Sequence, residues 1–424
     1  MDWNEKRWKR SVAEFGRFME PLVGELGRSE RREGASLYVE GLLTPGQRKS
    51  VEPMAARLHV DYQKLQQFVT DSPWDDGQVW SAIRREIVPV MEPLEAWITD
   101  ETGWVKQGNK SVGVAHQYCG AVGKQANCQV SVHVTVTNGE IALPIAGRLY
   151  LPESWTSDRD RCAEAGIPES VEFLTKPKIA LELIQQALAE GVPKAPVLGD
   201  SVYGDAGPLR GALRVQGMEY FFQVEERLLA WTHPVKIERS RKHWRVAEGQ
   251  PAPLPLRAIA EQILPDQWKL GRWKNAEGEK QTTRIAWLPI YLLSDLDEET
   301  GAWPQTLLVV DWPEGKPDPY HCYVAHLHTQ PNKVRCLRLS RSRFHVEQYF
   351  QRDKDDLGLD HFEGRSWRGF HHHLVLAAAA YIFVLLAYLE SKKQFWIYVG
   401  GSITSDSAVV RAVNRLLSAL PHEI

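Results

Sequence analysis

The feature that most constrains the fold is a strictly alternating run of valines. Valine occupies every second position from 130 to 136, with serine, histidine and threonine between. A period of two predicts a strand with one buried face. Asn138-Gly139 follows, a pair that favours a tight hairpin turn, and 141–151 supplies the returning strand. With the short apolar stretch 96–100 ahead of it, this hairpin predicts a three-stranded antiparallel meander.

The segment after the meander alternates helices and short strands. A helix is predicted from Thr175, which can cap it, to Gly191, which can end it. Residues 195–200 predict a short buried strand, and a helix at about 207–216 leads to another strand at 220–224. Strands joined through helices pair in parallel. A meander, then helix, strand, helix, strand and a late helix is the order of an RNase H-like core, so we predict an α/β fold with a mixed sheet.

Four regions are expected along the chain. Residues 1–92 show short amphipathic helical segments without strand alternation and predict a helical N-terminal domain. Residues 93–224 are expected to form the first part of the core, and 336–424 the second part with C-terminal helices. Between them, 225–335 is rich in Pro, Trp and Arg/Lys and carries strand-like runs. This segment predicts a β-rich insertion subdomain.

Charge alone does not identify a ligand. The net charge of −3 over 424 residues is compatible with a cytosolic enzyme that acts on a small molecule. From 236 to 284, however, 11 Lys and Arg stand against 6 Asp and Glu, a local balance of +5. A local stripe of this kind can bind phosphates even when the whole chain is nearly neutral.

Cysteine usage and hydropathy favour a cytoplasmic protein. The five cysteines are scattered without a C-x-x-C pair, which predicts reduced thiols rather than a disulfide framework or a zinc ribbon. The N-terminus lacks an apolar core, so no signal peptide is expected. The apolar run 374–389 is shorter than the roughly 20 residues of a membrane span and predicts a buried helix. No phosphate-binding loop of the Walker A type is present around Lys124, so ATP dependence is not expected.

The string from Arg343 to Lys354 carries the strongest chemical pattern. Glu347 follows Arg343 by four positions and precedes Lys354 by seven, so on a helix the three side chains share one face. A carboxylate between two cations suits a phosphodiester site, because the acid can hold a metal ion while the cations bind the strand.

Two isolated aspartates can complete such a site. Asp100 lies in the first predicted strand, and Asp200 ends the strand after the first helix. Strand ends of a mixed sheet gather side chains at one edge. Together with Glu347 from a covering helix, these aspartates could hold two divalent cations such as Mg²⁺, which activate a nucleophile and stabilise the leaving oxygen. Taken singly, an aspartate at a strand end is more often a turn or helix cap.

Three blocks of residues resemble the catalytic blocks of IS701-family transposases, DDE enzymes of bacterial insertion sequences in the IS4-like group. The first block begins at Asp100-Glu-Thr-Gly103 and extends to Gly120; the second is Gly199-Asp-Ser-Val-Tyr-Gly-Asp205. The third runs from Glu347 through Asp360-His361 to Arg365-Ser-Trp-Arg-Gly369. The resemblance covers about 20–395. It departs at Ser340, where the group often has Tyr, so contacts made by that Tyr cannot be carried over.

The resemblance implies an RNase H-like core in which Asp100, Asp200 and Glu347 are the catalytic residues and metal ligands. It implies a DNA transposase that uses Mg²⁺, or Mn²⁺ in its place, to cut each transposon end and to join the freed 3′-hydroxyl to target DNA. The expected partner is double-stranded DNA, both terminal inverted repeats and target. A homodimer on DNA is expected, without ATP or a membrane, in the nucleoid-containing cytoplasm.

Further residues are candidates for DNA contacts. Arg343 and Lys354 are expected to hold phosphates, and Arg365 and Arg368 flank Trp367, which either stacks on a base or belongs to the core. The helical N-terminal region is expected to help recognise the inverted repeats, where phosphate contacts position a protein and base contacts specify the sequence.

Several neighbours compete for these roles. Glu101 should point to the face opposite Asp100, and Asp205 is interpreted as a helix cap. Asp353, Asp355 and Asp356 are expected to be solvated. Three consecutive histidines, 371–373, cannot chelate one ion because helical neighbours are about 100° apart, so a phosphate contact or a helix start is expected.

Three alternatives remain open. The first is a nuclease of the same fold that hydrolyses DNA without joining it. The second is a non-catalytic DNA-binding protein derived from a transposase. The third is a carbohydrate-active enzyme with two carboxylates, which the 16 tryptophans suggest.

Overall fold

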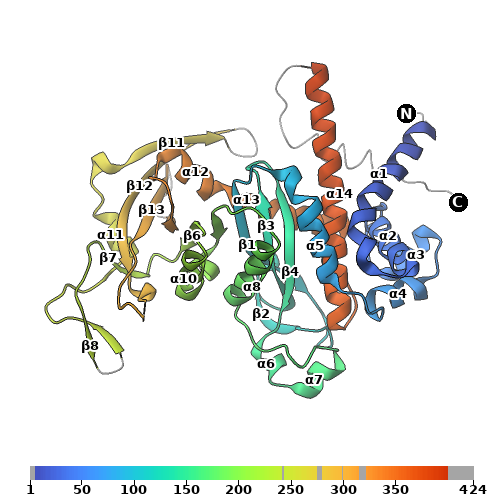
Figure 1. The fold of residues 1–424 in the computed structure, drawn as a ribbon, viewed down its shortest axis with the longest axis horizontal. Coiled ribbons are helices and arrows are strands. Elements are labelled where there is room, and N and C mark those ends of the chain that lie inside the picture. Colours follow the sequence, from blue (N-terminus) through green and yellow to red (C-terminus); the bar gives the residue numbers. More distant parts are fainter. Residues whose placement is uncertain (1–4, 241–242, 275–278, 298, 315–320, 400–424) are drawn as a thin grey trace.

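The computed structural model describes residues 5–240, 243–274, 279–297, 299–314 and 321–399. Figure 1 shows three regions side by side: N-terminal helices, a central sheet with helices on both faces, and a β-rich region beyond one edge of that sheet. The longest helix, α14 (Trp367–Val399), runs between the N-terminal helices and the sheet and packs against both.

The N-terminal region is helical, as predicted. Within residues 5–95 the structure contains helices and turns but no strand. Asp61 and Asp75 each begin a helix by accepting a hydrogen bond from the backbone N–H two residues later. The helices are α1 (Glu5–Val23), α2 (Ser29–Leu43), α3 (Val51–Leu58), α4 (Tyr62–Thr70) and α5 (Asp76–Glu86).

The central sheet has the RNase H-like order, which confirms the predicted fold class. Its strands lie in the order β4-β3-β1-β5-β6. The first three pair antiparallel, whereas β1, β5 and β6 pair in parallel. Their bounds are β1 (Ala96–Val105), β3 (Lys124–Thr137), β4 (Ala142–Tyr150), β5 (Val197–Gly199) and β6 (Tyr220–Val224).

The hairpin between β3 and β4 forms at the predicted Asn138-Gly139. Gly139 has a φ of 89°, which favours glycine, and the Asn138 side chain accepts hydrogen bonds from the backbone N–H groups of Glu140 and Ile141. A further strand, β2 (Ala115–Cys119), which the three-stranded meander did not include, pairs with the start of β3. The chain turns at 111–114, where Gly113 has a φ of 74°.

Helices cover the two faces of the sheet. On one face α8 (Lys176–Ala189) packs on β3 and β4. On the other face lie α13 (Phe344–Leu357) and the first half of α14. Short helices connect these parts: α6 (Glu153–Thr156), α7 (Arg159–Glu164), α9 (Ser201–Gly204), α10 (Gly207–Val215) and α12 (Lys333–Ser342).

The β-rich region extends the central sheet. The return strand β14 (His321–His326) pairs antiparallel with β6, so both regions belong to one sheet of 12 strands in the described chain. The predicted strand-like runs correspond to β12 (Lys280–Leu292) and β13 (Thr306–Pro313). The remaining elements are β7 (Leu229–Trp231), β8 (Ile237–Ser240), β9 (His243–Val246), β10 (Leu254–Pro255), α11 (Leu256–Glu261) and β11 (Lys269–Lys274).

The apolar run 374–389 lies in a core helix, as predicted. Among the described residues, α14 is the one helix long and apolar enough to cross a membrane, over Trp367–Glu390. The protein itself buries 72% of the most apolar window of that helix. Burial against α2, α4 and β4 accounts for its composition.

The three consecutive histidines of α14 link this helix to other elements. His371 accepts a hydrogen bond from the Leu149 N–H, His372 lies 2.9 Å from the carbonyl oxygens of Val69 and Trp74, and His373 lies 2.9 Å from the Tyr38 hydroxyl. All three are buried, so the predicted phosphate contact is wrong. Burial lowers the pKa of His373 to about 3 and keeps its ring neutral.

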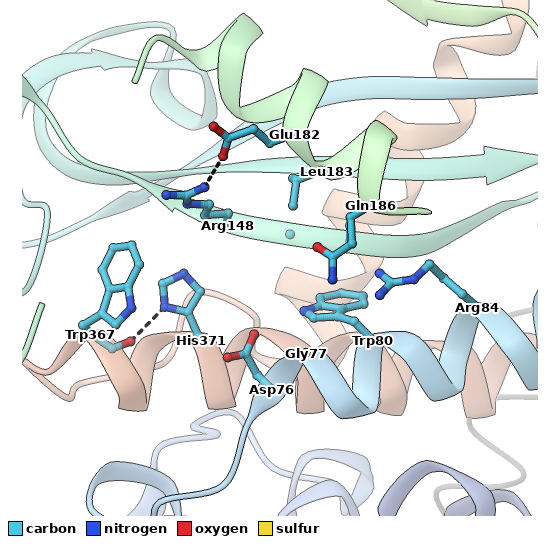
Figure 2. Close-up of a pocket in the computed structure, with 12 residues that line it drawn as sticks. Asp76, Gly77, Trp80, Arg84, Arg148, Glu182, Leu183, Gln186, Trp367 and His371 are labelled. Atoms are coloured by element: carbon cyan, nitrogen blue, oxygen red, sulfur yellow. Dashed lines mark hydrogen bonds and ion pairs between the residues drawn. The ribbon is translucent and has the colours of Figure 1, made fainter. Parts of the chain in front are cut away.

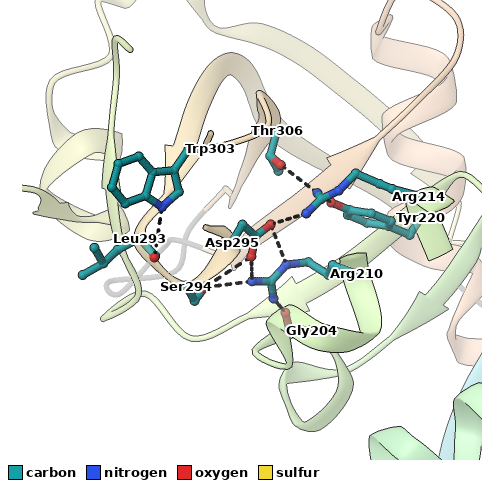
Figure 3. A network of polar contacts seen from close by, with 9 residues as sticks. All are labelled: Gly204, Arg210, Arg214, Tyr220, Leu293, Ser294, Asp295, Trp303 and Thr306. Atoms are coloured by element: carbon teal, nitrogen blue, oxygen red, sulfur yellow. Dashed lines mark hydrogen bonds and ion pairs between the residues drawn. The ribbon is translucent and has the colours of Figure 1, made fainter. Parts of the chain in front are cut away.

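A buried ionic network joins α10 to the turn that follows β12 (Figure 3). Arg210 and Arg214 of α10 both bind the Asp295 carboxylate, with an Arg214 Nη2–Asp295 Oδ2 distance of 2.8 Å. The side chains of Arg210 and Asp295 are fully buried. Arg210 also donates to the Ser294 hydroxyl and to the Gly204 carbonyl. The network connects the core to the insertion at a second place besides the β6–β14 pairing.

We predict that Asp295→Ala destabilises the protein by about 3–5 kcal/mol, because it leaves the buried charge of Arg210 without its partner. Urea unfolding measures this change. Glu261→Ala is the control: it breaks the solvent-exposed Arg257–Glu261 pair and should cost less than about 0.5 kcal/mol. Equal effects of the two substitutions would contradict the structural role of the network.

Candidate functional site

Asp100 lies within β1, and Asp200 directly follows the end of the neighbouring parallel strand β5. The register of β1 and β5 pairs Trp97 with Val197 and Ile98 with Leu198. Asp100 follows Ile98 by two residues and Asp200 follows Leu198 by two residues, so the two aspartates lie at the same level in the sheet. The negative charge of Asp200 contributes to raising the pKa of Asp100, which shows that the two carboxylates are within electrostatic range.

Glu347 reaches Asp100 through Arg343. Arg343 lies at the junction between α12 and α13 with a helical backbone, φ −59° and ψ −29°. Its Nη1 donates to Asp100 Oδ2 at 2.8 Å, and its Nη2 donates to Glu347 Oε1 at 2.7 Å. One guanidinium group therefore bridges two of the three predicted catalytic acids.

Lys354, the third residue of the set formed with Arg343 and Glu347, also faces β1. Lys354 Nζ donates to the carbonyl oxygen of Gly103 at 2.8 Å, three residues beyond Asp100 on the same strand. Arg343 and Lys354 therefore both contact β1, as expected if their side chains and that of Glu347 share one face.

Burial makes Asp100 an unusual carboxyl group. Its side chain is 11% exposed, and burial raises its pKa to about 7. The positive charge of Arg343 opposes this shift. The pKa of Asp200 is also raised, first by burial and then by the charge of Glu101. Burial therefore disfavours the charged form of both carboxylates unless a cation lies beside them.

Glu101 points to the opposite face of the sheet from Asp100, as predicted. There Lys176 Nζ of α8 donates to Glu101 Oε1 at 2.7 Å, and the Tyr203 hydroxyl donates to Oε2 at 2.8 Å. Tyr203 is fully buried and belongs to the short helix that follows Asp200. Sequence reasoning missed this pair of contacts, although Tyr203 stands inside the second resembling block.

Asp200 has a structural as well as a candidate chemical role. Its Oδ1 accepts a hydrogen bond from the Val202 N–H at 3.0 Å and so caps α9. Asp205 does not begin a helix; it follows α9, and its Oδ1 accepts from the Glu225 N–H at 3.1 Å. Asp205 is thus a helix cap, as predicted, at the C-terminal end of α9, and its side chain also links that end to the residue after β6.

The predicted DNA-contact residues after α13 lie in two settings. Arg365 and Arg368 are exposed. Trp367 is half-buried and lines a pocket of about 240 Å³ between α5, α8, α14 and the β4 edge (Figure 2). Because β4 is two strands from β1, and strands are about 4.8 Å apart, the β4 edge lies roughly 10 Å from the strand that carries Asp100. Trp367 is therefore not part of the Asp100–Glu347 cluster.

The acidic residues do not surround a single point. Across the described parts of the chain, no group of three or more His, Cys, Asp or Glu side chains is arranged to hold one metal ion. Arg343 instead stands as a cation between Asp100 and Glu347. The same position suits a divalent ion chemically, because carboxylate oxygens are the ligands that Mg²⁺ prefers. The donor chemistry of the three acids therefore fits a divalent ion, while Arg343 lies between two of them in this structure.

Comparison with known proteins identifies the family. The family model of the DDE superfamily endonucleases matches residues 21–288, more than half of the chain. The chain belongs to this family. The matched residues of this DDE-family protein include Asp100 and Asp200 and end before Glu347.

A curated relative supports a narrower resemblance. The chain is 31% identical over 170 residues to a probable transposase for insertion sequence element IS701 from Microchaete diplosiphon. The alignment covers 39% of this chain and 42% of the relative, so it spans about two-fifths of either protein. The predicted resemblance to IS701-family transposases is confirmed.

One acidic residue of α13 differs from expectation. Asp353 is fully buried rather than solvated, whereas Asp355 and Asp356 are exposed as predicted. Burial raises the pKa of Asp353 to about 8. The folded protein therefore keeps a proton that the unfolded chain releases at lower pH, so the contribution of Asp353 to stability falls as the pH rises toward about 8.

We predict that Asp353→Asn increases stability on the order of 2 kcal/mol at neutral pH and changes it little below about pH 3.5, because the wild-type carboxyl is then protonated in both states. Thermal unfolding over a pH series measures the difference between variant and wild type. Asp355→Asn, an exposed position on the same helix, should show no such trend. A pH-independent difference for Asp353→Asn would contradict the raised pKa.

Proposed function

We propose that this DDE-family protein is a DNA transposase that cuts transposon ends and joins the free 3′-hydroxyl to target DNA. The observation that supports the proposal is the Arg343 guanidinium, which bridges Asp100 and Glu347 beside the strand that leads to Asp200. Asp100 in β1 and Asp200 after β5 stand level on neighbouring parallel strands, and Arg343 connects Glu347 to Asp100. The IS701 relative supports the same reaction class.

Asp100, Asp200 and Glu347 would hold Mg²⁺, with Mn²⁺ as a substitute. The bound ions would lower the pKa of an attacking water and stabilise the leaving oxygen of the phosphodiester. The protein contributes the charge and rigidity of the site. Asp200 is held by its cap to α9, and Asp100 is held by the backbone N–H of Glu101. Glu347, whose side chain is 49% exposed, is the most accessible of the three.

Cations around these acids would bind the DNA backbone. Arg343 and Lys354 lie along β1, and Arg365 and Arg368 lie on the surface after α13. A guanidinium group can bind a phosphate through two parallel hydrogen bonds. Trp367, in its pocket at the β4 edge, offers an aromatic ring for stacking on a base.

Other parts of the protein would recognise the substrate. The helical residues 1–92 would contact the terminal inverted repeats, and residues 236–284 of the β-rich insertion, with their local balance of +5, would add phosphate contacts. Two ends have to be cut together, so we propose a homodimer on DNA, without ATP, acting at the nucleoid in the cytoplasm.

Replacing a metal ligand tests the proposal. Asp100→Asn, Asp200→Asn and Glu347→Gln should each lower DNA cleavage by more than about 100-fold, the loss that even an outer-shell partner of a metal can cause. Cleavage of end-sequence DNA and joining to a plasmid are measured with Mg²⁺ and with a chelator. Asp355→Asn is the matched control on α13.

Each outcome assigns the activity. Cleavage without joined product would favour a nuclease, and DNA binding without any cleavage would favour a non-catalytic derivative. Activity on a polysaccharide that survives the chelator would favour a carbohydrate-active enzyme. Cleavage that persists in Asp200→Asn would refute the assignment of the triad.

The surface cations make a separate prediction. Arg365→Ala should weaken DNA binding by a similar factor for every sequence and reduce the slope of log affinity against log salt by about 0.9, the value for one phosphate contact on duplex DNA. Fluorescence anisotropy at several salt concentrations measures the slope. An unchanged slope would show that Arg365 makes no phosphate contact.

A further inference from the structure

Arg343 occupies the place where a metal would have to bind. Its two Nη atoms donate to Asp100 Oδ2 and Glu347 Oε1, at 2.8 and 2.7 Å. Mg²⁺ coordinates oxygen at about 2.0–2.1 Å and requires near-ideal octahedral geometry. A carboxylate oxygen that accepts a charge-assisted hydrogen bond from a guanidinium is not available as an open ligand position. Metal and Arg343 therefore compete for the same two side chains.

Electrostatic attraction to the two acids holds Arg343 in place when no metal is bound. Asp100 is buried, and an isolated buried carboxylate is unfavourable unless a cation neutralises it. Arg343 supplies that cation for both acids at once. Glu347, four residues away on the same helical face, holds the other end of the guanidinium fork.

The same side chain has a route out of the site. Arg343 is 28% exposed, and its backbone already has the helical conformation of the flanking helices. A change of side-chain rotamer can therefore turn the guanidinium outward without a change in α12 or α13. A DNA phosphate next to the site would offer it a hydrogen-bonding partner as good as a carboxylate.

We propose that Arg343 is an exchangeable counter-ion that couples metal binding to DNA binding. In the DNA-free protein it neutralises Asp100 and Glu347 and weakens metal binding; on DNA it transfers to a phosphate and leaves the carboxylates to the metal. This inference rests on the proposed function, since it uses the same triad. Its effect is that a metal-loaded site forms mainly where a DNA strand is present.

Because metal binding and DNA binding are thermodynamically linked, the coupling can be measured through the affinity for either ligand. If DNA tightens metal binding by some factor, the metal must tighten DNA binding by the same factor. Coupling of this kind between two ligands typically changes affinity by about 5–150-fold. Ca²⁺ or Mn²⁺ titrated with and without a duplex therefore reports the exchange without any cleavage assay.

The experiment compares wild type with Arg343→Gln and Arg343→Lys above the pKa of Asp100. Mn²⁺ binding is followed by isothermal calorimetry, and DNA binding by anisotropy in Ca²⁺ or chelator. Wild type should bind Mn²⁺ about tenfold more tightly on DNA. Arg343→Gln should bind Mn²⁺ without DNA as tightly as wild type does on DNA, and DNA should no longer change that affinity. Arg343→Lys, which keeps the charge without the fork, should fall between.

Arg338→Ala is the matched control, because it removes a cation from α12 that pairs with Glu95 rather than with the triad. It should retain the full coupling between Mn²⁺ and DNA. Thermal unfolding checks that every variant is folded, and Arg343→Lys supplies a second test if Arg343→Gln is not.

The outcomes separate the two proposals. If Asp200→Asn binds Mn²⁺ like wild type, the triad does not hold the metal and the proposed function fails. If Mn²⁺ binding depends on the triad but Arg343→Gln keeps the DNA-free affinity and the coupling of wild type, the exchange proposed for Arg343 alone is overturned.

Discussion

The pairing of β1 along both of its edges is the constraint on which the site depends. β3 binds one edge in antiparallel register, with Asp100 opposite His133, and β5 binds the other edge in parallel. Side chains alternate between faces along a strand, so a slip of one residue would exchange Asp100 with Glu101. Asp100 would then lie with Lys176 of α8, and Glu101 would lie under α13. The register of β1 therefore determines that Asp100 binds Arg343 and that Glu101 binds Lys176.

Much of the fold could be predicted from local patterns. The period of two from 130 to 136 and the Asn138-Gly139 turn predicted the central hairpin. A half-buried strand and a tight turn are both encoded by residues that are neighbours in the sequence. The order of the later helices and strands predicted the parallel half of the sheet. Boundaries were less accurate: α14 begins at Trp367, ahead of the apolar run 374–389 that predicted it, and a separate helix, α12, meets α13 at Arg343.

The candidate site was predictable in outline but not in its contacts. The spacing of Arg343, Glu347 and Lys354 indicated a shared face, and the structure orients that face toward β1. The bridge from Arg343 to Asp100 joins residues 243 positions apart, and no local pattern reports such a distance. The same reason explains the burial of Asp353 and of the three histidines of α14. Their surroundings come from α2, β4 and the loop before α14, which sequence periodicity does not relate to them.

The continuity of the sheet has a mechanical consequence. β14 hydrogen-bonds to β6, and β6 hydrogen-bonds to β5, the strand that ends next to Asp200. The insertion is therefore not a module on a flexible tether; a ladder of backbone hydrogen bonds and the Asp295 cluster attach it to the strand that presents a candidate ligand. A displacement of the outer strands would therefore be transmitted through backbone hydrogen bonds to β5, the strand that precedes Asp200.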